Sequence, residues 1–239
     1  MLLLDSGDTL FRGGDSTAAD DPNQGAWVIE AMNTMGYDAL AVGNRELQAP
    51  LVVVQARFGE ARFPILSANV KNDGALPGVQ PYMLHQVAGH TIAIIGVTSP
   101  QTEQRLADLG LDPAVQDPID AVRQVVDEVS KTADIVILLS NLDRPATEAL
   151  AQAIPGIDAI VGIFAGVQRD PLAIPGAKDQ VVLHASGMAG EYLGLLILHV
   201  DARGQVTSFD GRALALTDWY ADDPQMVEMI RRYASVSSP

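Results

Sequence analysis

Two short polar segments carry the side chains with which this chain could do chemistry, and each directly follows an apolar run. Gly7-Asp8 comes after residues 2–4, and Gly43-Asn44-Arg45-Glu46 comes after residues 39–42. Carboxylate and amide oxygens bind divalent cations, and a pair of cations about 3.5–4 Å apart can activate water for attack on a phosphate ester. In two-metal phosphatases such ligands lie on loops at the carboxyl ends of strands. The two segments therefore carry oxygen ligands of the kind that divalent cations bind.

The order of these segments resembles that of the calcineurin-like metallophosphoesterases and, within them, the 5'-nucleotidase branch. In that family a Gly-Asp pair and a Gly-Asn-His-Glu segment each carry a metal ligand. Weaker matches follow in the same order at residues 67–70, 94–97, 155–159 and 194–196. The resemblance implies hydrolysis of a phosphate ester, with Asp8 bridging two cations (Mn, Zn or Mg) and Asn44 supplying an amide oxygen.

Arg45 departs from the family pattern at the position of the catalytic histidine. In the family, that histidine protonates or orients the leaving oxygen. An arginine stays charged and can hold a phosphate, but it cannot donate a proton near neutral pH. Two interpretations stay open. Arg45 either fills the metal region as a fixed cation beside Asp8 or is an ordinary surface residue paired with an acid at little energetic consequence.

The remaining ligand motifs of the family also differ. Asn141 stands where the family has a lone histidine, and Phe164 and Gly166 stand where it has two more. The Asp-x-His strand that opens the family domain is missing from the chain as given, and so is the C-terminal nucleotide-binding domain. We therefore expect Asp8 and Asn44 to be remnants of a metal site, too few to hold two cations.

These departures predict a catalytically degenerate protein that serves as a binding or assembly module and has no cofactor. Asn44, Arg45 and Asn141 would bind the ligand, and no residue is assigned as catalytic. The alternative is a weakly active hydrolase of phosphate esters with a reduced metal site. That site would use Asp8, Asn44 and either Asn141 or Asp143, with Mn, Zn or Mg as its metal.

Other polar residues near the expected loops have open roles. Glu46, Asp143 and Arg144 could bind a small polar ligand, or they could be solvated loop residues. The four histidines fall at no family motif, and a structural or surface role is expected for each of them: His85, His90, His184 and His199.

The composition limits the possible partners. The chain of 239 residues has a formal charge of −15, from 30 acidic and 15 basic residues, so we expect no binding to nucleic acid or to an anionic membrane. Its apolar runs are too short to cross a bilayer, and no signal peptide is evident in the chain as given, so we expect a soluble protein. The absence of cysteine excludes thiolate metal sites and leaves the compartment undetermined.

The elements that must position these loops follow from apolar periodicity. Strands are expected at residues 2–5, 38–42, 135–139 and 157–161, an extended segment at 64–70, and a hairpin at 82–87 and 91–97. Helices are expected at residues 25–35, 50–59, 118–132, 146–154 and 223–233. Three consecutive antiparallel strands are expected at the end, at residues 181–184, 192–200 and 205–216.

This alternation predicts an α/β protein, a metallophosphoesterase-type four-layer α/β/β/α sandwich with mixed sheets, in a single domain over residues 1–239. Without the first family strand, a sheet edge or an apolar face should be uncovered. Such a surface predicts a homodimer or a protein partner.

Overall fold

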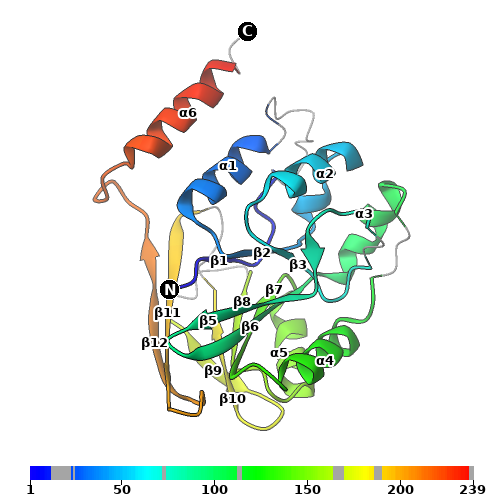
Figure 1. Cartoon of the computed structure of the whole chain (residues 1–239), viewed down its shortest axis with the longest axis vertical. Helices are drawn as coiled ribbons and strands as arrows, with labels where there is room; N and C mark the ends of the chain where they lie inside the picture. The colour runs from blue at the N-terminus through cyan, green and yellow to red at the C-terminus, as the bar shows by residue number, and fades with distance from the viewer. Residues whose placement is uncertain are drawn as a thin grey trace.

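The computed structural model describes residues 1–11, 23, 25–71, 74–111, 115–163, 170–185 and 190–236, without the side chains of residues 235 and 236. Its described strands form three sheets (Figure 1). The first is parallel, in the order β1 (Leu4–Asp5), β2 (Ala39–Ala41), β3 (Ile65–Leu66) and β4 (Val79–Gln80). The second is mixed, in the order β5 (Tyr82–Val87), β6 (His90–Val97), β7 (Ile135–Ser140), β8 (Ala159–Gly162), β10 (Gln180–His184) and β9 (Leu172–Pro175). The third is the hairpin of β11 (Tyr192–Val200) and β12 (Val206–Ala215).

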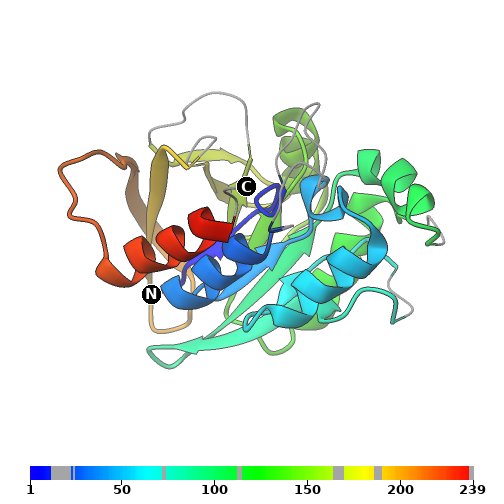
Figure 2. The same ribbon diagram turned by 90° about the horizontal axis from the view of Figure 1, so that it is seen from above.

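Helices cover the outer face of each of the two larger sheets. In Figures 1 and 2, α1 and α2 lie on the side of the first sheet, and α4 and α5 lie beside the second. The helices are α1 (Ala26–Met35), α2 (Leu51–Glu60), α3 (Glu103–Asp108), α4 (Pro118–Val129), α5 (Arg144–Ala153) and α6 (Pro224–Val236), with short 3-10 turns η2 (Arg45–Leu47) and η3 (Pro100–Thr102).

Three separate apolar layers result from this stacking. Leu40 and Ile65 pack towards α1 and α2, and Leu138 and Leu183 pack towards α4 and α5. The middle layer lies between the sheets and contains Ala41, Leu66, Ile94 and Leu139, together with Leu196 of the hairpin. Residues of one strand alternate between two layers because successive side chains point to opposite faces. The four-layer α/β/β/α sandwich with mixed sheets is confirmed.

A buried hydrogen-bond network joins the two larger sheets close to their carboxyl edges. The Thr98 hydroxyl donates to the Val42 carbonyl at 2.7 Å, and the Thr98 N–H donates to Asn69 Oδ1 at 2.9 Å. The Asn69 amide returns a bond to the Thr98 carbonyl at 2.8 Å. Gly96 allows the close approach, since a Cβ there would overlap the Leu66 backbone. The network fixes the ends of β2 and β6 relative to each other.

The structure confirms most of the expected elements, including the antiparallel β5–β6 hairpin and the buried strand β7. Of the three antiparallel strands expected at the end, the pair β11 and β12 is confirmed, but the strand at residues 181–184 does not join it. β10 pairs in parallel with β8 and antiparallel with β9, an element that the sequence analysis did not predict. Val181 and Leu183 face one apolar layer and Val182 the other, so β10 is buried on both faces, as a central strand is.

Among the residues that the structure describes, no helix is both long enough and apolar enough to cross a bilayer.

Candidate functional site

The expected loops meet at one edge of the fold. Because β1 and β2 are parallel neighbours, Gly7-Asp8 and Gly43-Asn44 leave the first sheet on the same side. Asn141 follows β7 of the second sheet, and its amide nitrogen donates to the Ser6 carbonyl at 3.0 Å. The structure therefore brings together the loops of Asp8, Asn44, Arg45 and Asn141, although Asp8 and Asn141 are 133 residues apart in the sequence.

Two glycines make this close approach possible. A Cβ on Gly43 would lie 2.5 Å from both Asp8 Oδ1 and Asn141 Nδ2. Gly7 has a φ of 95°, and a Cβ there would lie 2.8 Å from the Ala41 carbonyl oxygen. Only glycine fits at either position without moving a neighbour.

The buried Glu46 side chain holds the two loops together, because it accepts hydrogen bonds from both. Its carboxylate is completely buried and accepts the backbone N–H groups of Asp8 at 2.8 Å, Thr9 at 2.6 Å, Leu10 at 3.1 Å and Gly43 at 2.8 Å. Burial, together with the nearby Asp8 carboxylate, raises the pKa of Glu46 to about 7, although its backbone donors oppose the shift. The solvated role left open for Glu46 is therefore wrong.

The turn that carries Asp8 is fixed by Asp5. The Asp5 carboxylate accepts the Gly7 N–H at 2.8 Å and the Thr9 hydroxyl at 2.9 Å. Burial raises the pKa of Asp5, and the bonds from Gly7 and Thr9 oppose that change. Asp8 itself has a φ of 65°, in the left-handed region that non-glycine residues seldom adopt. Its Oδ1 accepts the backbone N–H of Arg45 at 3.0 Å.

Arg45 contacts Asp8 through its backbone N–H and not through its guanidinium. The guanidinium forms no ion pair or hydrogen bond with any residue in the described part of the chain, and the side chain is half-buried. The Asn44 side chain is half-buried as well and does not cap η2. Within the described part of the chain, neither side chain is therefore bound to another group.

The described residues fit a metal only in part. The Asp8 carboxylate and the Asn44 amide oxygen are suitable ligands for one divalent cation. However, Asp8 Oδ1 already accepts the backbone N–H of Arg45 at 3.0 Å, and the Asn141 amide nitrogen donates to the Ser6 carbonyl. No group of three or more His, Cys, Asp or Glu side chains that could hold a metal occurs within the described ranges. Phe164 and Gly166 lie outside the described residues.

Asp143 and Arg144 lie at the start of α5, where the structure gives each of them a local partner. Asp143 caps α5, because its Oδ1 accepts the Ala146 N–H at 2.8 Å. Arg144 pairs with Glu148 at 2.8 Å on the exposed face of that helix. Asp143 thus uses one carboxylate oxygen as a helix cap, and its expected part in a reduced metal site stays a prediction.

His184 is the unexpected residue near this edge. It ends β10, is only 2% exposed, and neither ring nitrogen has a hydrogen-bond partner among the described residues. Its register partner is Val161, which faces the layer between the sheets. Burial lowers the pKa of His184, against the nearby charge of Asp170, which favours a neutral ring. The apolar run before His184 was the signal that it would be buried.

Known proteins with similar sequences and structures point to one family, although no protein-family model matches the chain. Human 5'-nucleotidase is 30% identical over 256 aligned residues, which cover 98% of this chain and 44% of that protein. UshA of Yersinia enterocolitica is 31% identical over 73% of this chain and 33% of its own length. The chain thus spans less than half the length of these relatives.

Two solved structures share the fold. The 5'-nucleotidase precursor of Thermus thermophilus superposes with a TM-score of 0.83 and 26% identity, over 98% of this chain and 49% of that one. The calcineurin-like phosphoesterase YfkN of Bacillus subtilis gives a TM-score of 0.75 at 21% identity, over 98% and 83%. The fold is that of a calcineurin-like metallophosphoesterase. Within that superfamily, the chain belongs to the 5'-nucleotidase branch.

Proposed function

We propose that this chain binds a phosphate-bearing ligand at the edge formed by Asp8, Asn44, Arg45 and Asn141, and that it has lost most of the hydrolytic activity of its family. The observation that carries this proposal is the set of groups around the Asp8 carboxylate. This carboxylate accepts the N–H of Arg45 at 3.0 Å, and the Asn141 amide nitrogen, like Asp8 Oδ1, flanks Gly43, where a two-metal site would need further ligands.

Arg45 supplies the attraction for phosphate. Its guanidinium is planar, permanently charged and suited to bidentate contact with two phosphate oxygens. It forms no ion pair within the described part of the chain, although the protein carries 30 acidic residues. A ligand phosphate would give this cation a partner without displacing an existing one.

Among the described residues, the two side chains proposed to meet the ligand, Arg45 and Asn141, supply no general acid for hydrolysis. Arg45 cannot protonate a leaving oxygen near neutral pH, and the Asn141 amide cannot act as a general acid. His184 points into the layer between the sheets and is buried. Binding without rapid turnover is therefore the function that these side chains support best.

Calorimetric titration with phenyl phosphate tests the binding role. We expect saturable binding that Arg45→Gln weakens by about tenfold, which is about 1.4 kcal/mol. Arg144→Gln is the matched control, because Arg144 lies at a nearby helix start and pairs with Glu148 across an exposed surface. Equal affinity in the Arg45 and Arg144 variants would contradict the proposal.

A weakly active hydrolase is the second candidate, and the hydrogen bonds accepted by Glu46 favour it. These bonds still fix the two loops that carry Asp8 and Asn44, the oxygen donors expected for a metal. Bound Mn, Zn or Mg would supply Lewis-acid polarisation of a phosphoryl oxygen. Turnover of phosphate esters with each metal, abolished by Asp8→Ala, would establish this candidate over the first. A homodimer or protein partner remains a prediction, which light scattering at micromolar concentration tests.

A further inference from the structure

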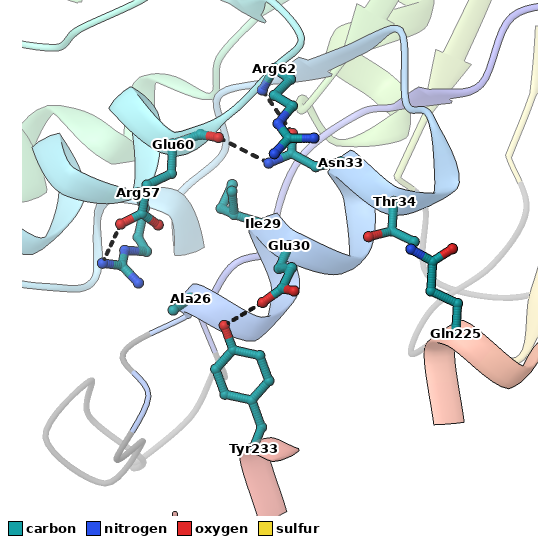
Figure 3. A pocket seen from close by; sticks show the side chains of 10 residues that line it. All are labelled: Ala26, Ile29, Glu30, Asn33, Thr34, Arg57, Glu60, Arg62, Gln225 and Tyr233. Carbon is teal, nitrogen blue, oxygen red and sulfur yellow. Dashed lines mark hydrogen bonds and ion pairs between the residues drawn. The ribbon is translucent and has the colours of Figure 1, made fainter. Parts of the chain in front are cut away.

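A groove lies between α1, α2 and α6, on the helices that cover the outer face of the first sheet. Its volume is about 620 Å³, within the range of small-molecule sites. Figure 3 shows Arg57 and Glu60 on one wall, Thr34 and Gln225 on another, and Ile29 between them. The lining residues are Ala26, Ile29, Glu30, Asn33, Thr34, Arg57, Glu60, Arg62, Gln225 and Tyr233.

The two carboxylates of this groove, Glu30 and Glu60, already have partners within the protein. One Glu30 oxygen pairs with Arg232 and the other accepts the Tyr233 hydroxyl at 2.8 Å. Those two bonds, with a smaller effect of the Arg62 charge, hold the pKa of Glu30 below its ordinary value, so Glu30 is ionised and matched. Glu60 pairs with Arg57 at 2.8 Å.

Asn33 is also fully engaged and shapes one end of the groove. Its amide nitrogen donates to the Glu60 carbonyl at 2.9 Å, and its amide oxygen accepts the Arg62 backbone N–H at 2.7 Å. These two bonds tie α1 to the end of α2 and hold Arg62 at the rim, as the dashed lines in Figure 3 show.

The donors of the groove, in contrast, are in excess. Arg57 is only 14% exposed, and its Nε has no hydrogen-bond partner among the described residues although it is completely buried. The Arg62 side chain is exposed, and its guanidinium makes no ion pair within that same part of the chain. A buried donor without an acceptor costs free energy, about 1–3 kcal/mol, and because this atom has no exposed surface, a ligand acceptor would reach it only after the Arg57 side chain shifts towards the groove.

The groove lining holds two arginines, Arg57 and Arg62, and two acids, Glu30 and Glu60, in a protein whose formal charge is −15. Both acids are engaged, Glu60 by Arg57 and Glu30 by residues of α6, so Arg62 is left without an ion pair in the described part of the chain. An arginine in this state is a binding group for an anion. The planar guanidinium matches the oxyanions of both phosphates and carboxylates.

We propose that this groove binds a small oxyanion-bearing molecule, a phosphate monoester or a carboxylate, through Arg62 and Arg57. Gln225 and Thr34 lie opposite as further polar partners (Figure 3). Because Gln225 and Tyr233 belong to α6, a bound anion would also stabilise the packing of α6 on α1 and α2. This site is separate from the edge at Asp8 and does not depend on the function proposed for it.

Titration by NMR with inorganic phosphate and with succinate tests the proposal on the full chain. We expect saturable shifts in α1, α2 and α6 for at least one of these probes, with binding weakened by about tenfold in Arg62→Gln. Arg57→Gln should have the same direction. Arg123→Gln is the control, because Arg123 makes the same type of i,i+3 pair with Asp120 on α4, on the other side of the protein.

The outcomes separate this groove from the edge at Asp8. Binding that persists in Arg45→Gln and is lost in Arg62→Gln supports the groove, even if the edge binds nothing. Shifts with phosphate alone identify a phosphate ligand, and shifts with succinate alone identify a carboxylate. No saturable shift with either probe up to about 10 mM, or equal binding by the Arg62 and Arg123 variants, overturns the proposal.

Discussion

Glu46 accepts the backbone N–H of Asp8 at 2.8 Å across 38 positions of sequence, and this bond determines where the Gly7-Asp8 loop lies. The same carboxylate binds Gly43, so one side chain holds both loops that carry the candidate ligands. Removing it should therefore affect stability and site geometry together.

Replacing Glu46 by alanine should lower the free energy of unfolding by about 3–5 kcal/mol, because buried N–H groups would lose their acceptor. Urea denaturation measures this loss. Glu148→Ala is the control, since Glu148 makes an exposed pair with Arg144 and should change stability by less than about 1 kcal/mol. Similar stabilities of the two variants would show that Glu46 does not hold the loops.

Gly43→Ala should reduce ligand binding at the edge more than it reduces stability. The added methyl group would lie 2.5 Å from Asp8 Oδ1 and from Asn141 Nδ2, so both side chains must move. Gly59→Ala is a matched control, because no atom outside the helix backbone lies within 4 Å of its Cβ position in α2. That control should gain about 0.5–1 kcal/mol, since alanine favours a helix. Unchanged phenyl phosphate affinity in Gly43→Ala would contradict the geometry.

Asp158 should make stability depend on pH. Burial raises its pKa to about 6, against the bond from the Val136 N–H at 2.8 Å and with a small contribution from Asp179. The folded state therefore favours the protonated form, so this contribution is fully present below about pH 4 and is lost as the pH rises to about 6. The loss is at most about 3 kcal/mol.

The test compares the pH dependence of unfolding in the native chain and in Asp158→Asn. The difference between the two curves should fall with rising pH through this window and level off above it. Other buried acids act in the same direction, but they cancel in the comparison. Parallel curves from pH 4 to pH 7 would contradict a raised pKa of Asp158.

Glu30→Gln should loosen α6 without unfolding the protein. Glu30 joins α1 to Arg232 and Tyr233, and these contacts are partly exposed, so we expect a loss of about 1 kcal/mol or less in global stability. Amide hydrogen exchange should become faster in α6 alone. Glu228→Gln, on the exposed pair with Arg231, should leave the exchange unchanged. Uniform protection in all three proteins would show that α6 is held by other contacts.

The sequence by itself determined the layered α/β architecture and the family, because both depend on local patterns. Apolar periodicity marked strands such as β7 and helices such as α4, and Gly-Asp and Gly-Asn marked the loops at the edge. It did not place β10 beside β8, because strand pairing depends on which layers bury Val182 and Leu183.

Only the tertiary structure decided the roles of individual polar side chains. In the sequence, Glu46 and Asp143 are both acids near loop ends. In the fold, Glu46 accepts backbone donors from two distant loops, whereas Asp143 caps the helix that it begins. Likewise, nothing in the sequence assigns Arg57 and Arg62 to a common groove with α6. The physical reason is that hydrogen bonds and burial depend on the distances between residues far apart in the chain, which a local pattern does not contain.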